Sequence, residues 1–288
     1  MQTNVDFEAM KRLSADIRIE TIRELAEAGF GHIGGSASIA DVLAVLYGGV
    51  MNIDNQNPIW EQRDWLVLSK GHCGPSLYAA LALKGYFPME WLKTVNKPGT
   101  RLPSHADRLR TPGIDMSTGS LGQGISAAVG IALGNKTKGI DSYTYCIVGD
   151  GELNEGQVWE ASQAASNYKL NHFILFVDWN KKQLDGPIDE ICNPLDIGRK
   201  FEAFGFCVQT VKGYSVVEIY EAIQRAKLDT CKPSVIILDT YKGLGVSFAE
   251  RAKFNHYLVI NQEMAEEGIN EIEKRYASGT YPKGDVKW

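Results

Sequence analysis

The sequence predicts an α/β protein in which a mostly parallel β-sheet is sandwiched between helices. In the second half of the chain, apolar and β-branched runs alternate with amphipathic segments. Parallel strands that are buried on both faces have this continuous apolar character. The 288 residues are 44% hydrophobic and 23% charged, which is typical of a globular protein. Because no linker or internal repeat interrupts the chain, we expect a single domain over residues 1–288.

The first half is predicted to be mainly helical. Residues 6–29 place apolar side chains at helical spacing and end in glycines. The run WLVLS at 65–69 indicates a short strand, and a stretch rich in Pro, Gly, Ser and Thr at 96–120 indicates an ordered, irregular loop. Further helices are expected at 37–48, from Pro75 onward, and at 124–136.

Strands and helices alternate in the second half. Apolar runs bounded by turn residues predict the strands, and the segments between them predict crossover helices. The charged tail from about residue 262 is expected to form a surface helix and a loose end. The predicted strands are 142–149, 172–178, 206–211 and 234–240, and the predicted helices are 155–168 and 215–227.

Net charge and cysteine content indicate which partners and which cellular compartment to expect. The formal net charge is −5 and no basic block occurs, which argues against nucleic acid or an anionic membrane as the main partner. The five cysteines are odd in number and form no C-x-x-C motif, which argues against a disulfide framework or a zinc ribbon. The N-terminus lacks the apolar core of a signal peptide, and no apolar run is long enough to span a membrane. We therefore expect a cytoplasmic protein.

An aspartate and an asparagine follow two consecutive predicted strands. Asp150 stands between Gly149 and Gly151, and Asn180 comes thirty residues later, about the length of one βαβ unit. Both then lie at the carboxyl ends of parallel strands, where α/β sheets bind ligands. With one loop carbonyl after Asn180, they would suit Mg²⁺ that also binds a phosphate. The alternative is that Gly-Asp-Gly is only a strand-ending turn.

Four of the five histidines follow or lie within small-residue turns: His32, His72, His105 and His256. Loops at strand ends converge on one edge of a sheet, so these side chains are candidates for a common site. His172 opens a predicted strand and is expected to be structural.

A glycine-rich stretch, 118–124, precedes a predicted helix. It formally matches part of a dinucleotide fingerprint, but no apolar strand leads into it. It either approaches a cofactor or permits tight helix packing, and both alternatives remain open. No P-loop motif occurs, which argues against a P-loop kinase, and residues 242–245 alone indicate an ordinary loop.

Together these residues resemble the diphosphate-binding half of thiamine diphosphate enzymes, and among them the transketolases. That family's signature is Gly-Asp-Gly followed about thirty residues later by Asn. The sequence of 149–161 is most similar to the separately encoded N-terminal subunits of two-chain transketolases. The segments that match, in order, are GHIGGS (31–36), RDWLVLSKGH (63–72), STGSLGQG (117–124), GDGELNEGQVWEA (149–161), VDWNKKQLDG (177–186) and TYKGLGVSFAE (240–250).

The resemblance implies a thiamine diphosphate-binding fold, with thiamine diphosphate and Mg²⁺ as cofactors. Asp150 and Asn180, with the main-chain carbonyl of Lys182, would bind the metal, which holds the diphosphate. Lys182 departs from the more apolar residue of many relatives, but a main-chain ligand leaves its side chain away from the metal. The residues expected to bind the cofactor are His72, Gly119, Ser120, Leu121, Gly151, Glu152, Asn180 and His256.

The resemblance also implies which residues act in catalysis and which lie at the contact between subunits. His32, His105 and His256 would surround the reacting carbons and exchange protons with hydroxyls of the donor sugar. Glu155 and Glu160 would lie where two subunits meet.

Single-chain relatives continue into a pyrimidine-binding domain and a C-terminal domain, which these 288 residues do not include. We therefore expect both on a separate polypeptide, two copies of each chain in the complex, and no activity from this chain alone. The expected reaction is transfer of a two-carbon ketol unit from a ketose, phosphorylated or otherwise anionic, to an aldose. Alternatives are another thiamine diphosphate reaction, such as formation of 1-deoxyxylulose 5-phosphate, or a non-catalytic binding subunit; a nicotinamide cofactor is a remote alternative.

Overall fold

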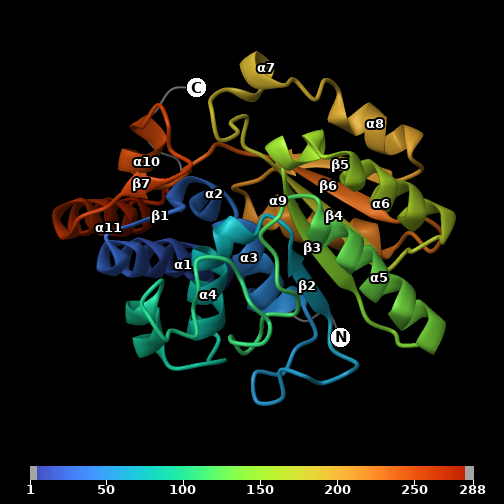
Figure 1. Ribbon diagram of the computed structural model, residues 1–288, viewed down its shortest axis with the longest axis horizontal. Helices are drawn as coiled ribbons and strands as arrows, with labels where there is room; N and C mark the ends of the chain where they lie inside the picture. The colour runs from blue at the N-terminus through green and yellow to red at the C-terminus, as the bar shows by residue number, and fades with distance from the viewer. Residues whose placement is uncertain (1–4, 283–288) are drawn as a thin grey trace.

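The computed structural model describes residues 5–282 and confirms the α/β architecture (Figure 1). A five-stranded sheet has the order β2-β3-β4-β6-β5, and every neighbouring pair in it is parallel. The predicted strands are correct to within two residues at each end. The strands are β2 (Trp65–Leu68), β3 (Thr144–Gly149), β4 (Phe173–Trp179), β5 (Cys207–Lys212) and β6 (Ser234–Asp239).

Alternate residues of the strands supply two apolar cores, one on each face of the sheet. Leu68, Ile147 and Phe176 pack on one face, whereas Val148 and Val177 pack on the other. Helices cover both faces, so β2, β3, β4 and β6 are almost entirely buried, whereas the edge strand β5 is only partly buried. The first face carries α1 (Phe7–Ala28), α3 (Ala40–Val45), α4 (Gly74–Leu83) and α9 (Val216–Lys227); the second carries α5 (Gln123–Lys138), α6 (Gly156–Asn167) and α8 (Ile197–Ala203).

The segment predicted as one helix at 37–48 is instead broken into shorter pieces. Helix α2 (Ile33–Ser38) starts earlier and includes the glycine pair of the GHIGGS segment, and Ile39 leaves helical geometry before α3. The glycines serve close packing: a Cβ on Gly34 would lie 2.2 Å from the main-chain oxygen of Asn255. A π-helical turn, η1 (Leu46–Val50), follows α3.

Several short helices and strands are not predicted from the sequence. A two-stranded antiparallel ribbon joins β1 (Phe30–Gly31) to β7 (Leu258–Val259), although more than two hundred residues separate them. Elements this short contain too few residues for a period to be recognised. The others are α7 (Ile188–Ile191), α8, α10 (Ser247–Arg251) and the 3₁₀ helices η2 (Gly71–Cys73), η3 (Met89–Thr94) and η4 (Gly151–Asn154).

The predicted C-terminal helix is α11 (Gln262–Ala277), which packs beside α1 (Figure 1). Its buried face joins Ile272 to Ile22 of α1 in a third apolar core. The end of the predicted loose tail, residues 283–288, lies outside the described residues. No helix among residues 5–282 is both long and apolar enough to cross a membrane.

A buried ion pair joins α1 to α3, and its guanidinium also contacts the loop after β6. The guanidinium of Arg18 donates to Asp41 Oδ2 at 2.6 Å, to Ser14 Oγ at 2.8 Å and to the main-chain oxygen of Leu244 at 2.8 Å. Both charged side chains are almost fully excluded from solvent. The bond from Arg18 to Leu244 thereby fixes the loop that follows Lys242.

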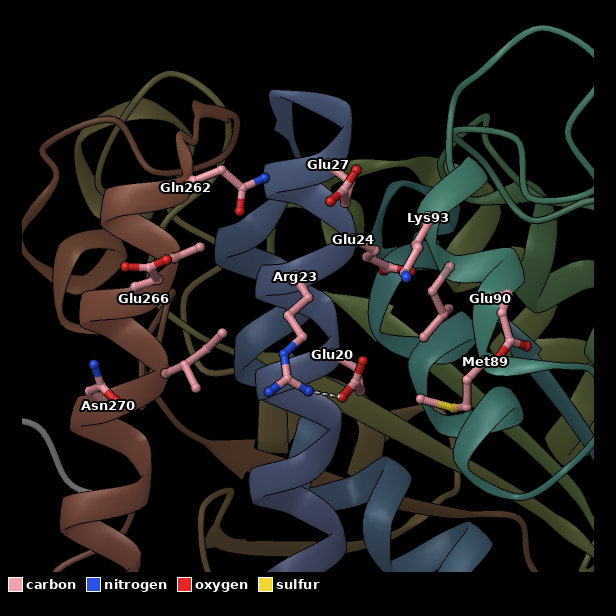
Figure 2. A pocket seen from close by; sticks show the side chains of 13 residues that line it. Glu20, Arg23, Glu24, Glu27, Met89, Glu90, Lys93, Gln262, Glu266 and Asn270 are labelled. Atoms are coloured by element: carbon pink, nitrogen blue, oxygen red, sulfur yellow. Dashed lines mark hydrogen bonds and ion pairs between the residues drawn. The ribbon is translucent and has the colours of Figure 1, made fainter.

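A hollow of about 660 Å³ lies between α1, η3 and α11 (Figure 2). Most of its charged residues are acidic, and Glu24 is unusual among them because its side chain is only 1% exposed. Among residues 5–282, neither of its carboxylate oxygens has a hydrogen-bond partner. Burial, and then the charge of Glu20, raises the pKa of Glu24 well above its ordinary value. This carboxyl therefore destabilises the fold once it ionises.

Arg18→Met should lower the free energy of unfolding by about 3–5 kcal/mol, because it leaves the Asp41 carboxylate buried and unpaired. Arg12→Met is the matched control, since Arg12 pairs with Asp16 and Glu273 in partly exposed positions and should cost less than about 1 kcal/mol. Urea denaturation measures both. Equal losses in the two variants would contradict the expectation.

Glu24→Met should raise the free energy of unfolding at pH 8 by about 1–3 kcal/mol. In the unfolded chain this carboxyl ionises near pH 4.5, whereas in the folded protein its pKa is higher. The penalty is therefore absent below pH 4.5 and develops as the pH rises above that value. Thermal unfolding of wild type, Glu24→Met and the exposed control Glu27→Met at pH 4 and pH 8 tests this. A gain that is the same at both pH values would contradict it.

Candidate active site

A cavity of about 250 Å³ opens at the carboxyl ends of the parallel strands. Strand register explains its position, because Gly149 pairs with Asp178 and Trp179 pairs with Asp239, so β3, β4 and β6 end side by side. Eleven of the predicted site residues line it: His32, His72, His105, Gly119, Leu121, Asp150, Gly151, Glu152, Asn180, Lys182 and His256.

Four other predicted residues lie elsewhere. Ser120, Glu155 and Glu160 are exposed, the two glutamates at the start of α6 and within its first turns. His172 lies just before β4, at the opposite edge of the sheet, and stacks on Tyr143 with ring centroids 4.4 Å apart. That position agrees with the structural role expected for His172.

The Asp150 side chain points toward the loop after β4. Its Oδ1 accepts a hydrogen bond from Gly151 N at 2.8 Å, and its Oδ2 accepts one from Lys181 N at 2.5 Å. Burial, followed by the nearby charge of Asp178, raises the pKa of Asp150. A cation in the cavity would offset both effects.

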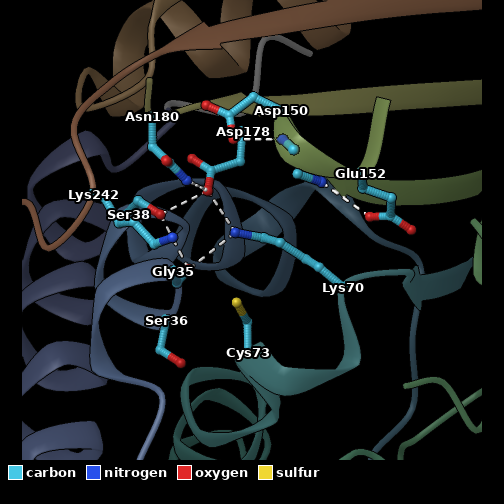
Figure 3. Close-up of polar contacts among 12 residues, drawn as sticks. Gly35, Ser36, Ser38, Lys70, Cys73, Asp150, Glu152, Asp178, Asn180 and Lys242 are labelled. Carbon is cyan, nitrogen blue, oxygen red and sulfur yellow. Dashed lines mark hydrogen bonds and ion pairs between the residues drawn. The ribbon is translucent and has the colours of Figure 1, made fainter. Parts of the chain in front are cut away.

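Asp178 organises the floor of the cavity and was not singled out from the sequence (Figure 3). Its Oδ2 accepts from Asn180 Nδ2 at 2.6 Å, from Ser38 Oγ at 2.7 Å and from Lys70 Nζ at 2.5 Å. Lys70 also donates to the main-chain oxygen of Gly35 at 3.0 Å. Because Asn180 Nδ2 is bonded to Asp178, its Oδ1 is turned away from that carboxylate.

Lys242 lines the cavity as well, and the sequence does not predict it as a site residue. Its Nζ donates to the main-chain oxygens of Lys182 at 3.1 Å and Gln183 at 3.2 Å, and it lies 3.2 Å from His256 Nδ1. Burial lowers the pKa of Lys242. Residues 242–245 therefore differ from the expected ordinary loop, since they bring a buried cation into the site.

The oxygen donors in the cavity fit a hard divalent cation. Asp150 and Asn180 both line it, and the carbonyl of Lys182 retains a lone pair beside the bond from Lys242. Within residues 5–282 no three His, Cys, Asp or Glu side chains are grouped to hold a metal by themselves. Mg²⁺ takes few protein ligands and completes its shell with phosphate and water.

The predicted histidines form one cluster. The ring centroid of His32 lies 5.4 Å from that of His72, 5.8 Å from that of His105 and 5.2 Å from that of His256, and His72 is 4.6 Å from His256. Burial lowers the pKa of all four; that of His32 falls to about 4 and that of His256 to about 3, with Lys242 adding to both shifts. The imidazoles are therefore neutral at pH 7 and can both donate and accept hydrogen bonds.

Glu152 holds the glycine-rich stretch against the sheet. Its carboxylate accepts from Ser69 Oγ, from Gly122 N at 2.8 Å and from Gly149 N at 3.1 Å. A Cβ on Gly124 would lie 2.5 Å from Ser69 Cα. Of the two alternatives for this stretch, tight packing therefore accounts for Gly124, whereas Gly119 and Leu121 line the cavity.

Comparison with known proteins agrees with this geometry. The family described as "Transketolase, thiamine diphosphate binding domain" matches residues 9–283. A 6-deoxy-6-sulfo-D-fructose transketolase subunit of Clostridium sp. is 52% identical over 91% of this chain and 95% of its own length. An apulose-4-phosphate transketolase subunit from Actinobacillus succinogenes is 38% identical over 93% of this chain and 98% of its own.

Single-chain transketolases match over only part of their length. The human enzyme is 38% identical over 92% of this chain but 42% of its own length. The solved transketolase of Leishmania mexicana superposes with a TM-score of 0.86 and 32% identity, covering 96% of this chain and 42% of that one. The chain therefore belongs to the transketolase family, in which it corresponds to the N-terminal, thiamine diphosphate-binding part.

Proposed function

We propose that this chain is the N-terminal subunit of a two-chain transketolase, which transfers a two-carbon ketol unit from a ketose to an aldose. The observation that carries the proposal is the single cavity in which Asp150 and Asn180, from neighbouring strand ends, meet the cluster of His32, His105 and His256. The whole chain, 1–288, then acts as one diphosphate-binding domain.

The cavity residues divide into two groups by chemistry. Asp150, Asn180 and the Lys182 carbonyl would hold Mg²⁺, while His72 and the main chain of Gly151 would meet the diphosphate of thiamine diphosphate. Gly119 and Leu121 would contact the cofactor, and Glu152 acts by fixing the neighbouring loop. Bound thiamine diphosphate supplies the carbon nucleophile and the electron sink that ketol transfer needs.

The histidines of this chain supply hydrogen bonding and proton transfer. His32, His105 and His256 are neutral because burial lowers their pKa values. A neutral imidazole can accept a proton from a donor hydroxyl and return it, without first losing one of its own. Lys242, beside His256 Nδ1, sets which nitrogen of that ring is free to face the substrate.

The site is completed by a second polypeptide in this proposal. The two relatives described above that match over at least 95% of their own length are transketolase subunits, whereas this chain spans 42% of the human and Leishmania mexicana enzymes. In the segment after Asn180, Leu184 lines the cavity and is exposed, and Ile191 and Leu195 are exposed farther along the segment. Such a surface suits a protein partner. We place the contact there and at Glu155 and Glu160, with two copies of each chain.

The substrate class follows from the relatives rather than from the cavity. The two transketolase subunits described above act on anionic ketoses by their names, one a sulfonate and the other a phosphate. We therefore propose an anionic ketose as donor. We place the complex in the cytoplasm, because all five cysteines are free thiols.

The purified complex with its C-terminal subunit, thiamine diphosphate and Mg²⁺ should convert an anionic ketose and an aldose into ketol-transfer products. Asp150→Ala should weaken cofactor binding by about 10–100-fold in calorimetry, because a metal ligand is lost. Asp185→Ala, in the exposed loop after Asn180, is the control and should bind normally. Absence of ketol transfer from every ketose phosphate and sulfonate tested would refute the proposal. Pyruvate consumption with release of CO₂ would instead indicate 1-deoxyxylulose 5-phosphate formation.

His32→Asn should lower kcat by about 10²–10⁴-fold, since a group that exchanges protons with the donor is removed. Cofactor affinity should change less than about twofold, because His32 is not among the expected metal or diphosphate ligands. His172→Asn, at the opposite edge of the sheet, should leave kcat unchanged. Steady-state kinetics and calorimetry measure these effects. Unchanged turnover in His32→Asn would favour a non-catalytic role for the cluster.

A further inference from the structure

His32 is held by rings on several sides, and one of these rings lies outside the cavity. Besides His72, His105 and His256, the ring of Tyr257 lies 5.2 Å from that of His32 with an interplanar angle of 77°. Tyr257 is 45% exposed and does not line the cavity, so it forms the outer side of the cluster.

The register of the small ribbon explains this contact. Phe30 pairs with Val259 and Gly31 with Leu258 in antiparallel strands, so the next position on each segment places His32 opposite Tyr257. Alternate residues of a strand share a face, which puts Phe30, His32, Tyr257 and Val259 on the same one. Phe30 stacks on Tyr257, with ring centroids 5.6 Å apart and an interplanar angle of 29°.

Contacts with neighbouring aromatic and imidazole rings orient the imidazole of His32. Among the described residues, no hydrogen bond reaches either nitrogen of its imidazole; Ser36 Oγ donates to its main-chain oxygen, not to its ring. The consecutive residues His256 and Tyr257 both approach its ring nearly perpendicularly, at 84° and 77°. Edge-to-face packing of this kind is favourable at such distances.

We propose that Tyr257 is a positioning residue, which fixes the His32 ring by edge contact and, with Phe30 stacked on it, excludes water from the outer side of the histidine cluster. The proposal rests on the proposed function only in taking His32 as a group that contacts the donor sugar.

The electrostatic surroundings of His32 make this shielding measurable. The titratable groups that face it are His72, His105 and His256, with Lys242 behind His256. Burial is the main reason that the pKa of His32 falls to about 4, and electrostatic repulsion from His105 and Lys242 adds to it. Removing the Tyr257 ring admits water to His32 but leaves those neighbours in place. Its pKa should therefore rise toward the ordinary value without reaching it.

NMR titration of the full chain labelled at histidine tests the contact without cofactor or partner. Tyr257→Ala should raise the pKa of His32 by about one unit or more and shift its ring resonances, whereas Tyr257→Phe should retain both. Phe254→Ala removes another exposed aromatic ring of the same loop and should leave His32 unchanged. Unaltered His32 resonances and pKa in Tyr257→Ala would overturn the proposal.

Kinetics of the assembled complex tests the positioning. Tyr257→Ala should lower kcat by about tenfold, with cofactor affinity within about twofold, because a misplaced catalytic ring costs rate rather than cofactor binding. Tyr257→Phe should be close to wild type. Normal kcat in Tyr257→Ala, despite an altered His32 titration, would also overturn the positioning role. If the wild-type complex shows no ketol transfer, that result counts against the proposed function alone. The effect of Tyr257→Ala on the His32 titration does not depend on ketol transfer.

Discussion

One carboxylate oxygen, Asp178 Oδ2, joins three separate parts of the chain at the floor of the cavity. Ser38 reaches it from the end of α2, Lys70 from the end of β2, and Asn180 from the loop after β4. In a buried environment such charge-assisted bonds are strong, and they direct the groups that make them. The cavity has its shape because these segments share one acceptor.

This arrangement places several charged side chains in the protein interior. Lys70, Asp178, Asp150 and Lys242 are all buried, and removing ions from water opposes folding unless partners compensate. Lys70 and Asp178 compensate each other, whereas Lys242 relies on main-chain carbonyls and Asp150 on main-chain N–H groups. The site is thus less stable than an apolar core of the same size would be. Such a balance is typical of sites that bind charged ligands.

The sequence was a good guide where the signal is local and periodic. Buried strands appear as apolar runs, and the residues immediately after them, Asp150 and Asn180, must then lie at one edge of the sheet. Asp178 was less visible because it ends an apolar run and has no turn around it. Lys242 follows a strand in a loop of ordinary appearance, and its burial depends on the packing of distant segments. The positions of four histidines in small-residue turns suggested a common site, and the resemblance to a family added their roles.

The remaining differences share a physical cause. The helix expected at 37–48 starts earlier, at Ile33, and it includes Gly34 because only glycine permits the main chain of Asn255 to approach so closely. The β1–β7 ribbon has two residues in each strand, so its pairing depends on tertiary contacts rather than on local preference.

The β1–β7 ribbon also determines when the histidine cluster can form during synthesis of the chain. Since it joins residue 30 to residue 259, a ribosome must have synthesised nearly all of the chain before His256 and Tyr257 can meet His32. A nascent or prematurely terminated chain would therefore contain Asp150 and Asn180 but not a complete histidine cluster. The long sequence separation makes this one of the slower contacts to form.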